Sequence, residues 1–161
     1  MPTVQVVKPD ELIEVHGVLV NYDQLPQEAA KSLPHSLPLI SSSFDPAKWN
    51  GGKSGQKETT LRLRRSDRSV STEVARQFVR SGGDIPCLPA EVAPLAEVWQ
   101  ELWEIGLWYV AALGEDDSQL WRDANGQPRV VFLDCNPKYV GINLHCNVGW
   151  YHLAWFAGIP G

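Results

Sequence analysis

The sequence lacks an apolar run of about 18 residues without charge, the minimum that a membrane-spanning helix needs. Its most apolar stretch, residues 94–113, is interrupted by Glu97, Glu101 and Glu104. The first 15 residues also lack the basic start and apolar core of a secretory signal. We therefore expect a cytoplasmic protein without a membrane partner.

Cysteine is scarce, with only Cys87, Cys135 and Cys146 present. An odd number without a secretory signal favours reduced thiols over a disulfide framework. The paired Cys spacing of structural zinc sites is absent, and His145 and Cys146 on a strand would point to opposite faces, so we predict no metal site. We expect Cys135 and Cys146 in the core, where free cysteine is commonly found. Cys87, between two prolines, is expected to be inert unless a nearby helix start lowers its pKa.

Motifs of common enzyme classes are missing or incomplete. No serine lies in a nucleophile elbow. Residues 47–54 loosely match a phosphate-binding loop, but that chemistry needs a strand before the loop and a helix after it. Here a Ser-Pro-containing stretch precedes the loop and a strand-like segment follows. We interpret the match as chance and predict no cofactor.

What the chain does contain is enough apolar mass for one domain of 161 residues, with 43% hydrophobic and 20% charged residues. Seven residues are tryptophan. Tryptophan combines a large apolar body with one N–H donor, so we favour a core with several aromatic anchors. The alternative is a surface that stacks on sugars or binds another apolar ligand.

The central structural prediction is a long helix over residues 94–113. The stretch is apolar around most of a helical circumference, which is typical of a helix buried on several sides. Pro94 suits the first helical position, and Gly114 suits the left-handed cap that ends a helix. The charged exception is a stripe formed by Glu97, Glu101 and Glu104.

Alternation and turn residues predict the remaining elements. A short helix over 72–81 is capped by Ser71. Two pairs, Val74 with Phe78 and Ala75 with Val79, are spaced to face the core, and Arg76 and Arg80 are expected to face outward. A short helix is also expected over 26–32. Strands are expected at residues 3–7, 12–22, 58–65, 129–135, 139–146 and 150–156, with a hairpin at Asn125-Gly126.

The fold class that follows is α+β: a mostly antiparallel sheet packed on or curled around the helix 94–113, plus the short helix 72–81. Residues 1–161 are expected to form a single domain. Residues 33–56 form a long irregular segment rich in Pro, Ser and Gly, which includes Trp49. Long loops are often functional, so this segment and Trp49 are candidates for partner binding. A loosely ordered connection is the alternative.

Charge is segregated along the chain. Residues 45–80 carry a net charge of +5, from nine basic and four acidic side chains, within a protein whose net charge is −5. Arginine suits carboxylate and phosphate partners, so this segment is a candidate binding surface. The alternative is ion pairing within the fold, for example with the glutamate stripe. The candidate residues are Arg62, Arg64, Arg65, Arg68, Arg76 and Arg80.

A polar group on the C-terminal strands is the one candidate for catalysis. His145 is predicted to pair across a hairpin with Tyr151, and Asp134 lies on an adjoining strand. Together these side chains have the chemistry of general acid–base catalysis. The alternative is an ordinary polar sheet face.

The leading functional hypothesis is a small intracellular binding or accessory protein. It would recognise another protein with an acidic surface through the arginine-rich segment and the loop 33–56. Nucleic acid is a less favoured partner, because no aromatic residues are interleaved with the arginines. The alternative is a cofactor-free enzyme with a tryptophan-lined pocket that uses His145, Tyr151 and Asp134. Carbohydrate binding by exposed tryptophans is the weakest alternative.

Overall fold

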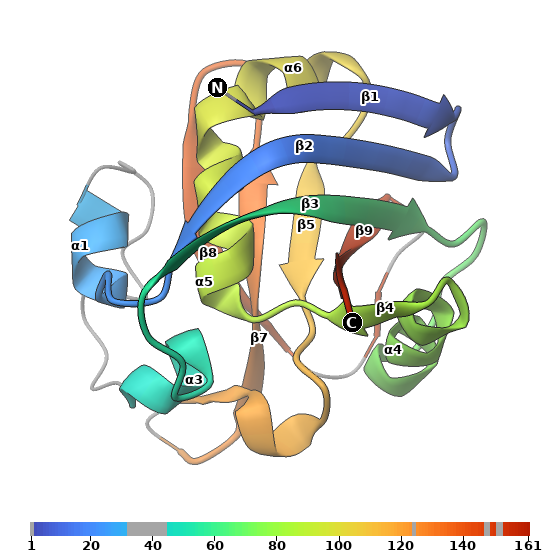
Figure 1. Cartoon of the computed structure of the whole chain (residues 1–161). Helices are drawn as coiled ribbons and strands as arrows, with labels where there is room; N and C mark the ends of the chain where they lie inside the picture. Colours follow the sequence, from blue (N-terminus) through green and yellow to red (C-terminus); the bar gives the residue numbers. More distant parts are fainter. Residues whose placement is uncertain (1, 32–44, 124, 147–148, 151–152) are drawn as a thin grey trace.

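A computed structural model describes residues 2–31, 45–123, 125–146, 149–150 and 153–161 (Figure 1). The first half of the chain contains β1 (Thr3–Lys8), β2 (Leu12–Asn21), α1 (Pro26–Lys31), α3 (Pro46–Asn50), β3 (Gln56–Arg65), α4 (Thr72–Ser81) and β4 (Asp84–Pro86). The second half contains α5 (Pro89–Val92), the 3-10 helix η1 (Ala93–Val98), α6 (Trp99–Glu104), β5 (Tyr109–Ala112), the 3-10 helix η2 (Asp117–Gln119), β6 (Trp121–Arg122), β7 (Pro128–Cys135), β8 (Val140–Cys146) and β9 (Ala154–Pro160).

Within the described residues, nine strands form one sheet in which β1, β2, β3, β9, β5 and β7 follow one another. β8 lies on the free side of β7, while β6 pairs with the start of β7 and β4 pairs with the end of β9. Each described pairing is antiparallel except that of β5 with β9. The prediction of a mostly antiparallel sheet in a mixed α/β fold is therefore confirmed.

The sheet curls strongly, so that β1, β2 and β3 cross in front of β5 and β7 (Figure 1). The segment α5–η1–α6 lies in the hollow between these two parts of the sheet (Figure 1). Leu95 and Leu102 on this segment are fully buried and share one hydrophobic cluster with Val15, Leu61 and Leu133 of the sheet. The main core is thus the space between the helical segment and the concave face of the sheet.

The prediction of one long helix over 94–113 is wrong. The helical segment begins at Pro89, adopts 3-10 geometry at residues 93–98, and ends at Glu104. Gly106 then takes a left-handed conformation with φ of 93°, which stops the helix. Tyr109–Ala112 is the strand β5, between β9 and β7. A segment that is apolar on all sides suits a central strand as well as a buried helix, and periodicity alone does not separate the two.

α4 covers the opposite, convex face of the sheet and has the predicted bounds. The Ser71 hydroxyl caps it by accepting a hydrogen bond from the Val74 amide at 3.2 Å. Ala75 and Val79 are fully buried in a second cluster with Phe156 of β9. The helix therefore contacts the sheet through these small side chains, one of the two pairs predicted to face the core.

The predicted orientation of the other α4 side chains is wrong for three residues. Val74 and Phe78, expected in the core, are 47% and 41% exposed. Arg76, expected outside, is only 2% exposed. Two apolar diagonals run along this helix, and the sheet contacts the one with the smaller side chains.

The predicted order of the C-terminal strands is also wrong at one point. A hairpin between 139–146 and 150–156 was expected, but β9 begins at Ala154 and inserts between β3 and β5. Trp150 instead forms an isolated antiparallel bridge with Val70. The Asn125-Gly126 hairpin is confirmed, with Trp121 opposite Arg129 and a longer loop than a two-residue turn. No described helix has the length and apolar character needed to cross a membrane.

Gly158 of β9 allows α4 and β4 to approach the sheet closely. A Cβ at this position would lie 2.7 Å from Val79 Cγ1 and 2.8 Å from Asp84 Cβ. We predict that Gly158→Ala lowers the free energy of unfolding by about 1–3 kcal/mol, because overpacking forces neighbouring groups apart. Urea unfolding measures the change.

Gly149→Ala is the matched control for this substitution. Among the described residues its Cβ would meet only the Val70 carbonyl oxygen, at 3.8 Å, which is an ordinary contact. The control is expected to change stability by less than about 0.5 kcal/mol. Equal effects of the two substitutions would contradict the close-approach explanation.

Candidate functional site

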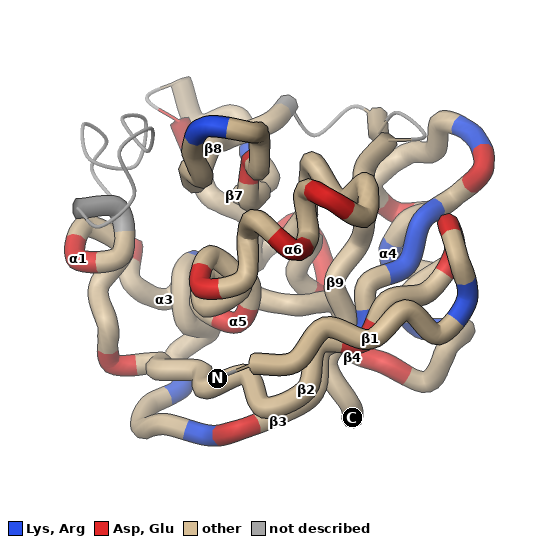
Figure 2. The backbone as a smooth tube through the Cα atoms, turned by 90° about the horizontal axis from the view of Figure 1, so that it is seen from above, with Lys and Arg blue, Asp and Glu red and all other residues tan. Residues whose placement is uncertain are grey.

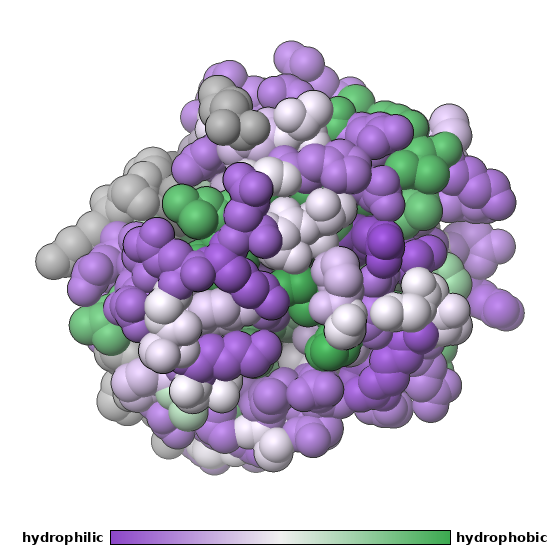
Figure 3. Space-filling model, in the orientation of Figure 1, coloured by the Kyte–Doolittle hydropathy of each residue, from purple (hydrophilic) through white to green (hydrophobic). Residues whose placement is uncertain are grey.

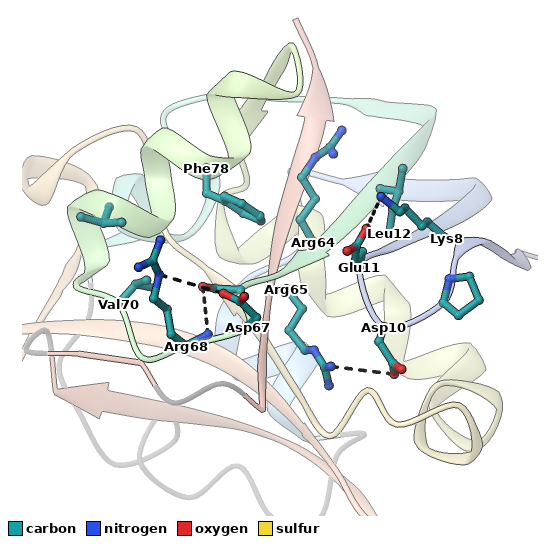
Figure 4. Close-up of a pocket in the computed structure, with 13 residues that line it drawn as sticks. Lys8, Asp10, Glu11, Leu12, Arg64, Arg65, Asp67, Arg68, Val70 and Phe78 are labelled. Carbon is teal, nitrogen blue, oxygen red and sulfur yellow. Dashed lines mark hydrogen bonds and ion pairs between the residues drawn. The ribbon is translucent and has the colours of Figure 1, made fainter.

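The described residues form an open groove of about 600 Å³ on the surface. Three parts of the chain surround it: the turn between β1 and β2, the end of β3 with the loop that follows, and the outer face of α4 (Figure 4). Its lining consists of Lys8, Pro9, Asp10, Glu11, Leu12, Arg64, Arg65, Ser66, Asp67, Arg68, Val70, Val74 and Phe78.

One side of the groove is apolar. Val74 and Phe78 lie four residues apart on α4 and so project from the same side of the helix. Leu12 and Val70 extend this surface from the two adjoining segments. A helix with two large exposed apolar side chains beside a groove presents a surface that a partner's side chain can cover.

The rim of the groove carries three ion pairs, one close and two near the 4.0 Å limit (Figure 4). Lys8 Nζ lies 2.6 Å from Glu11, Arg65 Nη2 lies 3.9 Å from Asp10, and Arg68 Nε lies 4.0 Å from Asp67. The acidic side chains of these pairs are 56%, 76% and 95% exposed, in the same order. Exposed pairs of this kind contribute little to stability. Lys8 and Arg68, whose side chains are 69% and 84% exposed, therefore remain accessible to an acidic partner, whereas the Arg65 side chain is only 24% exposed.

Arg65 is held more firmly than its loose ion pair suggests. Its guanidinium lies over the Trp155 ring, 5.6 Å from the ring centroid. Trp155 is paired with Arg65 across β3 and β9 and is itself buried. This cation–π contact orients the guanidinium at the edge of the groove without neutralising its charge.

Arg62 and Arg64 are used inside the fold. Arg62 Nη1 donates to the buried Asp84 carboxylate at 2.6 Å, and its Nε donates to Glu14 at 3.1 Å. Hydrogen bonds to Glu14 and Asp84 raise the pKa of Arg62 above its ordinary value. Arg64 Nη2 lies 3.6 Å from the second Asp84 oxygen, and its guanidinium packs against Gly82. Both arginines therefore have structural partners on the convex face.

Arg76 and Arg80 are also paired within the fold. Arg76 donates to the Leu113 carbonyl from Nη2 at 3.0 Å and to Asp117 from Nη1 at 2.8 Å. Arg80 contacts the Glu115 carbonyl and lies 3.4 Å from Glu73. The structure thus places Arg76 at the junction of α4 with the end of β5, where its burial shields it from an outside partner.

Trp49 and the predicted binding loop are placed only in part. Residues 33–44 of the loop 33–56 lie outside the described residues. The remainder includes α3, in which Trp49 is 1% exposed and belongs to the main core. Trp49 is therefore a core residue and presents no binding surface.

The polar group proposed for catalysis is not brought together among the described residues. His145 lies opposite Val130 and Asp134 lies opposite Gly141, so the two are about 13 Å apart along β7. His145 Nε2 is 2.8 Å from the Gly149 carbonyl, and its ring lies 4.3 Å from that of Trp150. The third predicted residue, Tyr151, lies outside the described residues.

The glutamate stripe does not face the arginine-rich segment. Among the residues that the structure describes, Glu97, Glu101 and Glu104 have no basic nitrogen within 4.0 Å. All three side chains are exposed. Ion pairing within the fold, the alternative raised for the arginines, is observed for four of them. Their acidic partners are not the three glutamates of the stripe.

Sequence reasoning missed a buried carboxylate close to Cys87. Glu91 is 1% exposed and accepts hydrogen bonds from the Tyr22 hydroxyl at 2.6 Å and from the Leu88 amide at 2.7 Å. Burial, with help from Glu91, raises the pKa of Tyr22 above its ordinary value. Glu91 therefore caps α5 and connects it to β2. Glu91 lies in a helical stretch whose polar residues show no regular spacing. The sequence therefore did not indicate that its side chain is buried.

The same surroundings exclude an activated thiol at Cys87. Its side chain is fully buried, and burial, together with nearby Glu91, raises its pKa well above the ordinary value. Cys135 is 1% exposed, and burial raises its pKa to about 12. The side chain of Cys146 is not described. In the described part of the chain, His, Cys, Asp and Glu side chains do not gather in threes as a metal ion would require.

Comparison with known proteins does not assign this geometry to a family. No family model, curated protein or solved structure matches the chain. The functional argument therefore depends on the groove itself.

We predict that Arg76→Ala lowers the free energy of unfolding by about 2–5 kcal/mol, because the Leu113 and Gly114 carbonyls and Asp117 lose a buried donor. Arg80→Ala is the matched control, one helical turn away and 40% exposed, with an expected loss below about 1 kcal/mol. Urea unfolding separates the two. A small effect at Arg76 would contradict its structural role.

We also predict that Cys87 and Cys135 resist thiol reagents in the folded protein. In a Cys146→Ser variant at pH 8, both thiols are expected to react with a disulfide reagent about a hundredfold more slowly than after denaturation. Burial restricts access, and the raised pKa values keep the thiols protonated. Rapid labelling of one thiol before unfolding would contradict this prediction.

Proposed function

We propose that this chain is a small intracellular binding protein that recognises another protein through the groove between the β1–β2 turn, the end of β3 and α4. The bound segment combines an apolar side chain with neighbouring acidic side chains. The observation that carries the proposal is the juxtaposition of exposed Val74 and Phe78 with accessible cations on a single concave surface.

The apolar side of the groove and its charged rim each account for one feature of the proposed bound segment. The apolar side chain packs against Val74 and Phe78, which gain from leaving water. The acidic side chains replace Asp10, Glu11 and Asp67 as partners of the rim cations. Because those native pairs are exposed and weak, this exchange costs little.

The groove favours protein over nucleic acid. Its four basic side chains are accompanied by three acidic ones, so it lacks the strongly positive field that binds a phosphate backbone. The whole chain has a net charge of −5, which adds long-range repulsion. The apolar side of the groove also lacks the row of aromatic side chains on which bases stack.

A displayed library of random peptides tests this proposal even while the partner is unidentified. The wild type is expected to enrich peptides with an aromatic or branched aliphatic residue flanked by Asp or Glu. A Val74→Ser/Phe78→Ser variant is expected to lose about tenfold or more in affinity for the enriched peptides, because truncating apolar anchors costs more than about 1 kcal/mol. Fluorescence polarisation gives the affinities.

The matched control is Leu19→Ser, which removes a side chain that is 56% exposed on β2 and is not part of the groove. This variant is expected to bind the same peptides as tightly as the wild type. Enrichment of basic peptides, or equal binding by the groove variant, would overturn the proposed function. Because Val74 and Phe78 are exposed, neither Val74→Ser nor Phe78→Ser is expected to unfold the protein.

A further inference from the structure

A segment with the composition that the groove favours is present in the chain itself. We call residues 101–109, which run from α6 into β5, the acidic loop. Glu101 and Glu104 are exposed, and Ile105, Trp108 and Tyr109 are each 38% exposed. Exposed apolar side chains next to exposed carboxylates form a surface that needs a basic and apolar counterpart.

Buried side chains within and next to the acidic loop fix its position. Leu102 and Leu107 inside it and Val110 just after it are fully buried in the main core. The Leu107 amide donates to the Leu102 carbonyl at 2.8 Å, which closes the turn. A presented segment that is already ordered loses little conformational entropy on binding. The loop cannot fold back into the groove of its own chain, because both of its ends are fixed in the core.

The two surfaces differ in charge. In Figure 2 the positions marked on α5 and α6 are acidic, whereas basic and acidic positions lie together on α4 and the turns beside it. Figure 3 shows, in the orientation of Figure 1, hydrophobic surface gathered at the upper right, on the side where β1 ends. Val6 and Val7, near the end of β1, are each 46% exposed. This apolar strip lies next to Lys8 at the rim of the groove. The apolar area available to a partner thus extends beyond the groove.

The sheet places the groove and the acidic loop near each other. Arg65 at the end of β3 and Val110 of β5 both pair with Trp155 of β9. Two strand spacings therefore separate the edge of the groove from the end of the loop, about 10 Å between Cα atoms. When two complementary surfaces lie side by side on one molecule, a twofold axis can place each of them against the other surface of a second copy. The same contacts then form twice.

We propose that the occupant of the groove is a second copy of this chain, whose acidic loop enters it. Glu101 and Glu104 of one protomer pair with Lys8 and Arg68 of the other, and Trp108 packs against Val74 and Phe78. The twofold relation repeats these contacts in reverse, so the dimer has two equal half-interfaces. This inference rests on the proposed function, since it uses the same groove and names its partner.

The electrostatic part of this association is sensitive to salt. The four charged side chains are exposed before association, and at physiological ionic strength their attraction is screened beyond about 8 Å. We expect the dimer dissociation constant to rise as salt increases from 50 to 500 mM, by about tenfold. The apolar contacts of Trp108 with Val74 and Phe78 do not share this dependence.

Charge exchange tests the proposal. Sedimentation velocity gives the dimer dissociation constant of the wild type and of three variants: Lys8→Glu/Arg68→Glu, Glu101→Lys/Glu104→Lys, and the combination of all four changes. Each double variant sets like charges opposite one another and is expected to weaken the dimer at least about tenfold. The quadruple variant exchanges the two sides, keeps the net charge of −5, and is expected to return to within about threefold of the wild type.

The control is Lys57→Glu, an exposed charge reversal on β3 outside the groove, which is expected to leave the dissociation constant unchanged. Circular dichroism confirms that each variant is folded. Three outcomes overturn the inference: a monomeric wild type at the highest soluble concentration, double variants that associate as well as the wild type, or a quadruple variant that stays as weak as the doubles.

Failure of this inference is distinguishable from failure of the proposed function. If the wild type is monomeric while the peptide library still enriches apolar–acidic sequences, the groove binds a different protein. If the groove variants also bind those peptides normally, the groove is not the recognition surface. If the dimer forms as proposed, a peptide containing residues 101–109 is expected to compete with it.

Discussion

The buried carboxylate of Asp84 is the interaction on which the arrangement of the candidate site depends. It lies on β4 with Arg62 on one side and Arg64 on the other, and its side chain is only 1% exposed. A buried charge that loses its partner is strongly destabilising, so the two arginines and the carboxylate constrain one another. Gly158 provides the space in which Asp84 and Val79 of α4 meet β9.

This cluster also sets the position of the groove. Arg64 packs against Gly82 at the end of α4, so the helix and the end of β3 are fixed relative to each other. Val74 and Phe78 then project from α4 beside Arg65 and Arg68. The groove exists because α4 meets the sheet through its small side chains and leaves its larger ones outside.

The arginine-rich segment divides into two roles that only packing separates. Arg62, Arg64 and Arg76 hold β3, β4, α4 and the end of β5 together through buried or half-buried acceptors. Arg65 and Arg68 border the groove, and their acidic partners among the described residues lie 3.9 and 4.0 Å away. A charge-reversal experiment on the whole segment would therefore mix loss of folding with loss of binding. Exposed Lys8 and Arg68 probe binding alone.

Local patterns in the sequence determined the first three strands β1, β2 and β3, the bounds of α4 with its Ser71 cap, and the mostly antiparallel sheet. These features depend on alternation, capping and turn residues, which act over a few neighbours. Tertiary structure decided the rest. Residues 109–112 became a strand because a central position between β9 and β7 was available, and β9 crossed the sheet because long-range pairing outweighed a local hairpin. The candidate site was also decided partly by sequence and partly by tertiary structure. The basic segment was visible in the sequence. The contact of Ala75 and Val79 with the sheet decided that Val74 and Phe78 face solvent.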